Sequence, residues 1–188
     1  ATANCRVLAF DYRLAPERPF PAALEYSVKA YRWLIEENGI SSDRVALIGD
    51  SAGGNLVLAA MLQVRDSGGP LPRAAVCVSS VFDLALTGDS VTGRASCDPM
   101  ILPESLRRCA SAYLGGADPR TPLASPLYAG LQSLPPLLIQ VGSEEMLRDD
   151  SVRLAEKARA LGVEVTLEEW PDMIHVWHLF ADKLSDGR

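Results

Sequence analysis

One short segment of the sequence has the composition of an activated serine nucleophile. Residues 49–53 read G-D-S-A-G, which places Ser51 midway between two glycines. In a G-x-S-x-G motif that joins a strand to a helix, the serine lies on a sharp turn that exposes its hydroxyl. The backbone N–H of Ala52 can then donate a hydrogen bond to the oxyanion of an acyl-transfer intermediate. The motif predicts acyl transfer at Ser51, and the alternative is a plain turn in which Ser51 caps the helix.

A serine hydroxyl needs a general base at neutral pH, and the sequence has two histidines to supply one. His175 and His178 both lie downstream of Ser51. His175 follows a predicted strand that ends at Trp170, so we expect it on a loop at a strand end, level with Ser51. His178 falls one helical turn further on and is expected to be a packed or solvated helix residue. The order along the chain admits both histidines, and the expected position at a strand end favours His175 as the base.

A carboxylate must in turn orient the base, and several acidic residues follow the apolar run that ends at Val141. Asp149 and Asp150 open a predicted helix, where we expect them to act as acidic caps. Glu144 and Glu145 lie on the preceding turn. Residue types and spacing leave both glutamates open as the acid of a catalytic triad.

Alternating apolar runs and helical patterns describe the scaffold that must hold these groups. The predicted strands are residues 7–11, 44–49, 74–78, 137–141 and 163–170. The predicted helices are residues 22–37, 52–65, 150–161 and 176–184. Buried strands separated by helices indicate a mostly parallel sheet covered on both faces. Segment 83–136 is rich in glycine and proline, with one clear helix at 103–114, and we expect it to act as a cap or pocket insertion.

Composition describes one globular domain and excludes several kinds of partner. The chain has 188 residues, of which 48% are hydrophobic and 22% charged, and its net charge is −6. This acidic balance argues against nucleic acid or an anionic membrane as a partner, because phosphates repel it. No stretch approaches the roughly 20 apolar residues needed to span a bilayer. We expect a single domain with a sizeable core.

The cysteines give no sign of a metal site or a disulfide framework. None of Cys5, Cys77, Cys97 and Cys109 belongs to a C-x-x-C pair, and only two histidines are available as further ligands. Cys77 lies in an apolar run and is expected to be a small core residue. We expect no metal, no cofactor and a reducing, cytoplasmic location.

Several motifs in one order along the chain resemble the hormone-sensitive lipase family of microbial esterases. Residues 11–17 read D-Y-R-L-A-P-E, with F-P-A-A at 20–23, and residues 49–56 read G-D-S-A-G-G-N-L. The family's later motifs are matched by S-P-L at 125–127, L-P-P at 134–136 and M-I-H at 173–175. The resemblance covers nearly the whole chain. It implies an α/β-hydrolase fold, with residues 1–188 as a single, partial catalytic domain that carries the insertion at 83–136.

The resemblance also selects the acid. The family's acid stands two residues before a leucine, usually in D-P-L, and here that register reads E-M-L at 145–147. Glu145 therefore takes the role, and Glu144 stays as the alternative. Glutamate in place of aspartate is a departure from the common pattern. So is Val176-Trp177, where many relatives have Gly-Phe after the histidine.

The largest departure is the absence of an H-G-G-G loop, which in the family precedes D-Y-R-L-A-P-E and completes the oxyanion hole. The family's N-terminal cap, its first strands and the strand that carries this loop would all precede Ala1. That last strand would lie between the predicted strands at 7–11 and 44–49. We therefore expect the chain to be part of a longer protein. Loss of one oxyanion donor typically costs about 10²–10³ in turnover, so residues 1–188 alone are expected to be poorly active. A missing central strand also leaves buried backbone groups without partners, so the chain alone is expected to be prone to aggregate.

The resemblance implies a carboxylic ester hydrolase that acts on short to medium acyl esters through an acyl-enzyme intermediate. Ser51 would attack, His175 would transfer the proton, Glu145 would orient the histidine, and the Ala52 N–H would bind the oxyanion. The expected partner is a small-molecule ester, and the resemblance admits a homodimer through the sheet edge.

Two other functions are compatible with the same motifs. Plant gibberellin receptors look like this family and keep the serine, but they bind a small molecule without catalysis and have lost the histidine. His175 in register favours the enzyme over such a binding module. An amide hydrolase shares the same triad, and sequence does not separate it from an esterase.

Overall fold

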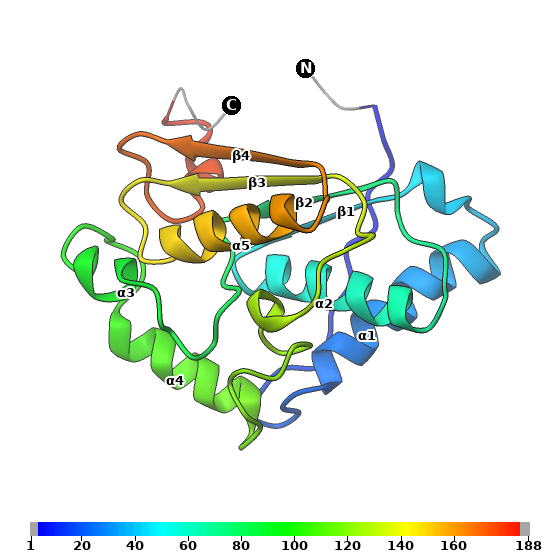
Figure 1. Cartoon of the computed structure of the whole chain (residues 1–188), viewed down its shortest axis with the longest axis horizontal. Helices are drawn as coiled ribbons and strands as arrows, with labels where there is room; N and C mark the ends of the chain where they lie inside the picture. The colour runs from blue at the N-terminus through cyan, green and yellow to red at the C-terminus, as the bar shows by residue number, and fades with distance from the viewer. Residues whose placement is uncertain (1–3, 185–188) are drawn as a thin grey trace.

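Four parallel strands form a single sheet, and helices pack against it. In the computed structural model, which describes residues 4–184, the strands are β1 (Ala46–Asp50), β2 (Ala74–Val78), β3 (Leu137–Gly142) and β4 (Val165–Trp170). They pair side by side in that order, all parallel (Figure 1). Because parallel strands run in one direction, their carboxyl ends meet at one edge of the sheet, which is where open α/β sheets bind ligands.

The helices connect the strands and cover the sheet. They are α1 (Ala22–Arg32), α2 (Ala52–Asp66), α3 (Ser90–Gly93), α4 (Pro103–Leu114) and α5 (Arg148–Ala160). Shorter helical turns are Trp33–Glu37, Ser42–Arg44, Pro126–Tyr128 and Trp177–Phe180. In Figure 1, α2 and α5 lie along the same side of the sheet, and α1 packs beyond α2. None of the helices within residues 4–184 is long and apolar enough to cross a membrane.

The hydrophobic core lies between the sheet and these helices. One cluster joins the inward side chains of the strands, such as Cys77 and Ile139, to Leu58 of α2 and Leu154 of α5. A second cluster packs α1 against the opposite side of α2. Since α2 is contacted on both sides, it is buried along most of its length, which explains its nearly continuous apolar sequence. The prediction that Cys77 is a small core residue is confirmed, and its thiol is free.

The second face of the sheet is less covered than the sequence predicted. The register places Ile48, Val76 and Leu138 side by side on this face, and Ile48 is 71% exposed. Within the described residues, cover on both faces is therefore not found, although the α/β class and the parallel sheet are confirmed. Strand β1 lies at an edge of the sheet, so the prediction that it is buried is wrong.

Two predicted elements do not form. Residues 7–11 are not in a strand, and Val7 is 84% exposed. A strand is stabilised by hydrogen bonds to a neighbouring strand, and β1 pairs only with β2 among the described residues. In place of the helix predicted at 176–184, a single turn forms at Trp177–Phe180, and Val176 lies outside it with a left-handed φ of 48°. The helix predicted at 103–114 is found with the same bounds.

Candidate active site

Ser51 lies on a tight turn between β1 and α2, in a backbone conformation that side-chain-bearing residues rarely adopt. Its φ is 51° and its ψ is −118°. Two backbone hydrogen bonds hold the turn, from Ser51 N–H to the Val78 carbonyl at 2.9 Å and from Val81 N–H to the Ser51 carbonyl at 3.4 Å. A Cβ on Gly49 would overlap the Gly53 carbonyl group. The glycines of the motif therefore let the helix start directly against the strand.

The hydroxyl of Ser51 is not used as a helix cap. Helix α2 begins at Ala52, and no side-chain hydrogen bond caps its first turn. The alternative reading of the motif, a structural capping serine, is therefore not what the structure shows. Ala52 opens the helix, where backbone N–H groups point outward and carry partial positive charge.

Glu145 and His175 form a buried pair that joins two strand ends. Glu145 lies in the turn after β3 and is fully buried, and His175, in the loop after β4, is 6% exposed. Glu145 Oε2 lies 3.1 Å from His175 Nδ1. Glu145 Oε1 accepts hydrogen bonds from the Gly142 N–H at 2.6 Å and the Ser79 hydroxyl at 2.7 Å. Because a carboxylate only accepts, Nδ1 carries the hydrogen in this arrangement, which leaves Nε2 able to take up a proton.

Glu144 points to a different partner. Its carboxylate forms an ion pair with Arg94 at 3.3 Å and accepts a hydrogen bond from the Ser143 hydroxyl at 3.0 Å. Its side chain is 29% exposed. The two neighbouring glutamates therefore differ sharply in position, and Glu145 is the one that contacts His175.

Ser51 and His175 line the same cavity, of about 550 Å³. Helix α4 forms one wall with residues at helical spacing, namely Ser105, Leu106, Cys109, Ala110 and Tyr113. Residues 12–15 and the start of α2, including Ala52, form other parts of the lining. No hydrogen bond joins the side chains of Ser51 and His175 among the described residues. The structure thus pairs Glu145 with His175, and His175 and Ser51 line the same cavity.

The remaining sequence candidates serve other purposes. His178 Nε2 lies 3.2 Å from Gln140 Oε1, and its ring packs 4.0 Å from that of Trp177. Burial lowers the pKa of His178. It is a packed residue, as predicted, although it lies on a short turn rather than a longer helix.

Asp149 and Asp150 lie in the first turn of α5, as predicted, but neither makes a capping hydrogen bond, so the capping part of that prediction is wrong. The first turn of α5 has no side-chain cap. Asp150 instead accepts hydrogen bonds from the backbone N–H groups of Phe82 and Asp83, at 2.7 and 2.9 Å, and Asp149 accepts one from Ser90. Burial raises the pKa of Asp150 to about 7. Asp150 thus ties α5 to the loop after β2, and Asp149 ties it to the start of α3. Helix-end patterns in the sequence do not report such long-range contacts.

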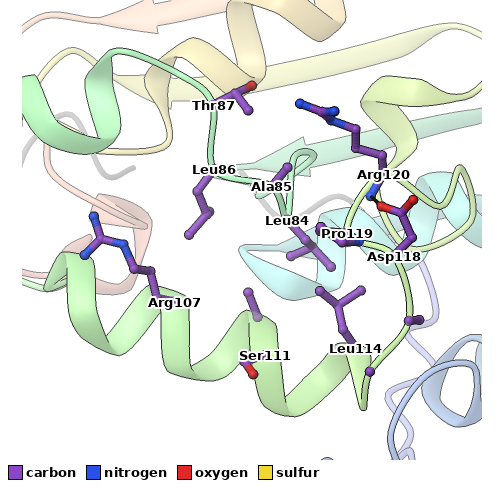
Figure 2. A pocket seen from close by; sticks show the side chains of 13 residues that line it. Leu84, Ala85, Leu86, Thr87, Arg107, Ser111, Leu114, Asp118, Pro119 and Arg120 are labelled. Atoms are coloured by element: carbon purple, nitrogen blue, oxygen red, sulfur yellow. Dashed lines mark hydrogen bonds between the residues drawn. The ribbon is translucent and has the colours of Figure 1, made fainter.

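A second cavity, of about 510 Å³, lies next to the first (Figure 2). Leu84 and Ala110 line both cavities, so the two chambers are neighbours. Figure 2 shows Arg107 and Arg120 on opposite sides of this second cavity. Neither Ser51 nor His175 is among its lining residues. Ser51, Ala52 and His175 line the first cavity, and Glu145 lies behind His175, outside the lining of either cavity.

Sequence reasoning missed the side chains that support the buried pair, above all Ser79. The only signal was a pair of serines directly after the apolar run at 74–78. Their position at the carboxyl end of β2, next to the strand that carries Ser51, could have indicated a place near the site.

Comparison with known proteins places these features in a family context. A family model described as alpha/beta hydrolase fold matches residues 1–179. An acetyl-hydrolase of Streptomyces hygroscopicus is 53% identical over 186 residues, which are 99% of this chain and 62% of that protein. Carboxylesterase NlhH of Mycobacterium tuberculosis is 36% identical over an alignment of 189 positions, which covers 95% of this chain and 58% of that protein.

Solved structures give the same result. The crystal structure of an esterase from the bacterial hormone-sensitive lipase family superposes with a TM-score of 0.92 at 54% identity, and it covers 94% of this chain and 59% of that one. A hormone-sensitive lipase from a metagenome library has a TM-score of 0.91 at 46% identity, with the same coverage of 94% and 59%. The chain spans about three fifths of the length of these relatives.

Proposed function

This chain belongs to the α/β-hydrolase fold family, among the esterases of the hormone-sensitive lipase type, and from that premise we propose that the protein hydrolyses carboxylic esters with Ser51, His175 and Glu145. The observation that carries the proposal is the buried Glu145–His175 pair, with Nδ1 and Oε2 3.1 Å apart, on the cavity that also contains Ser51. A carboxylate, an imidazole and a hydroxyl in this order are the parts of a serine hydrolase.

Each residue has a defined task in the proposed reaction. His175 Nε2 removes the proton from Ser51 as its oxygen attacks the ester carbonyl, and the alcohol leaves with that proton. Glu145 holds the histidine by Nδ1 and stabilises the imidazolium that forms. The Ala52 N–H donates to the oxyanion, where fixed donors have a large effect on the rate. Water then attacks the acyl-enzyme with His175 as base, and carboxylate is released.

The cavity supports small to medium esters as substrates. Its volume of about 550 Å³ lies in the ordinary range for small-molecule sites, and much of its wall is aliphatic or aromatic. Polar groups in it include Ser51 and His175 themselves. The name of the relative from Streptomyces hygroscopicus, an acetyl-hydrolase, agrees with short acyl groups. We also propose that segment 83–136, whose helix α4 lines the cavity, sets the size of ester that fits.

The proposal is tested by labelling the full-length protein that contains this chain with a fluorophosphonate. We expect one covalent adduct per chain, on Ser51, and none in a Ser51→Ala variant of unchanged thermal stability. We expect hydrolysis of p-nitrophenyl acetate or butyrate to be lost in parallel. An unlabelled wild-type protein, or a Ser51→Ala variant with undiminished ester hydrolysis, would contradict the proposal.

A further inference from the structure

Ser79 occupies a position between the strands that carry the proposed catalytic residues. It follows β2 directly, next to the strand that leads to Ser51 and the strand that leads to Glu145. Its side chain is fully buried. Its φ is 49°, and its N–H donates to the Gln140 carbonyl at 2.7 Å, which fixes the backbone at this point. The main chain that carries the Ser79 hydroxyl is therefore fixed at this point.

This hydroxyl makes two hydrogen bonds of opposite sense. It donates to Glu145 Oε1 at 2.7 Å and accepts from the Val176 N–H at 3.0 Å. A group that donates and accepts at once is required here, because one partner is a carboxylate oxygen and the other an N–H. Ser79 thus connects the acid of the buried pair to the residue that directly follows its histidine.

The contact to Val176 bears on the direction of the His175 side chain. Val176 has a φ of 48°, which is an unfavourable conformation for a β-branched residue and must be held by its surroundings. Val176 is buried, and the bond from its N–H to Ser79 is one of the interactions that hold it there. Since Val176 is bonded to His175, a shift of this peptide changes the orientation of the imidazole.

The contact to Glu145 determines which carboxylate oxygen meets the histidine. Oε1 is already taken by the Gly142 N–H and the Ser79 hydroxyl, so Oε2 is left for His175 Nδ1. Without Ser79, one of the three hydrogen bonds to the carboxylate is lost, and its rotation about the side-chain bonds is less restricted. Catalytic groups tolerate displacements of only about 0.5 Å, so this loss is expected to reach the reaction.

We propose that Ser79 is a positioning residue of the reaction, which acts through both Glu145 and the His175 loop. The inference rests on the proposed function of Ser51, His175 and Glu145. Ser79 is not among the residues that line the cavity of Ser51 and His175. Its removal should therefore lower the turnover of bound ester and leave substrate binding nearly unchanged.

The test compares Ser79→Ala with Ser80→Ala in the full-length protein that contains this chain. Ser80 is a matched control, since it is the next residue, is equally buried, and its hydroxyl donates only to the Val78 carbonyl, at 3.1 Å. Active sites are counted with a fluorophosphonate, so that unfolded protein does not enter kcat. We expect Ser79→Ala to lower kcat about 10- to 100-fold, the typical effect of losing a hydrogen bond to a charged group, with KM within about threefold. We expect Ser80→Ala to stay within about threefold of wild type in kcat.

Two further variants separate positioning from stability. Ser79→Gly removes the hydroxyl but relieves the positive φ, so it should fold where Ser79→Ala does not and show the same loss of kcat. In a Glu145→Ala background, Ser79→Ala should have a much smaller effect on kcat, because part of its role has already been removed.

The outcomes distinguish this inference from the proposed function. If Ser79→Ala and Ser79→Gly keep kcat per labelled site within a factor of two and lower only the melting temperature, Ser79 is structural and the inference is wrong. The same holds if the effect of Ser79→Ala is undiminished in the Glu145→Ala background. A loss of labelling at Ser51 in the wild-type protein would instead refute the proposed function.

Discussion

Replacing Glu145 by glutamine should disable the proposed catalytic machinery through the orientation of one amide group. Oε1 of Glu145 receives two donors, the Gly142 N–H at 2.6 Å and the Ser79 hydroxyl at 2.7 Å. In Glu145→Gln the amide oxygen must occupy this position, because an NH₂ group there would face the Gly142 donor without an acceptor. The NH₂ group is then directed at His175 Nδ1. Nδ1 becomes an acceptor, the ring hydrogen moves to Nε2, and Nε2 no longer accepts the Ser51 proton.

The expected loss is large and is confined to the chemical step. The equivalent change of tautomer in serine proteases lowers kcat about 10⁴-fold, which corresponds to about 5 kcal/mol of transition-state stabilisation. KM for p-nitrophenyl butyrate should change little, since Glu145 does not line the cavity. The assay is steady-state hydrolysis by the full-length protein, normalised to sites titrated with a fluorophosphonate.

Glu144→Gln is the matched control, because it makes the same chemical change one residue away. The partners of Glu144 are Arg94 and Ser143, and its side chain is partly exposed. Exposed ion pairs contribute little, so kcat should stay within about threefold of wild type. A Glu145→Gln variant that retains more than a tenth of wild-type kcat would refute this reasoning. So would a Glu144→Gln variant that loses more than Glu145→Gln.

Three other outcomes follow from the same structure. Gly49→Ala should lower the free energy of unfolding in urea by about 1–3 kcal/mol, because its Cβ would overlap the Gly53 carbonyl group. The control Gly53→Ala has open space at its Cβ and should be nearly neutral. Asp150 binds its proton more tightly in the folded state, with a pKa raised by burial from 3.8 to about 7, so its contribution to the unfolding free energy falls as pH rises through this window. Urea unfolding at pH 5 and 8 should show a smaller pH dependence in Asp150→Asn than in wild type, and an equal or larger one would contradict this. Leu106→Trp should reduce kcat/KM for p-nitrophenyl hexanoate about tenfold more than for the acetate, since Leu106 lines the cavity. Equal effects on both esters would contradict a role of α4 in ester size.

The sequence was sufficient to predict helix ends and tight turns, because these depend on residues that are close together in the chain. Helix α4 was placed correctly because Pro103 marks its first turn and Gly115, with a φ of 56°, ends it. The turn at Ser51 was recognisable because its small residues are required by close packing of neighbours in the chain. These features depend on the few residues around them, so one sequence is enough to reveal them.

The errors concern features that are decided by distant parts of the chain. Residues 7–11 have strand composition, but a strand also needs a neighbour to pair with, and composition does not reveal one. Asp150 was expected to cap its own helix, whereas it binds Phe82 and Asp83, 68 and 67 residues away. Residue type did not decide which of Glu144 and Glu145 faces His175. The backbone conformation of the turn determines where each of the two side chains points. The resemblance to a known family, rather than physical reasoning, singled out Glu145.

The wall that α4 adds to the cavity also bears on how this protein could change over time. The residues proposed for chemistry follow strands of the sheet, on turns held by buried hydrogen bonds. By contrast, the wall that α4 contributes consists of five side chains on one side of a single helix, Ser105, Leu106, Cys109, Ala110 and Tyr113. Mutations there can alter which esters fit while Ser51, His175 and Glu145 stay in place. Under the proposed function, a library confined to these helix positions should therefore change ester preference more than it changes the rate of the chemical step.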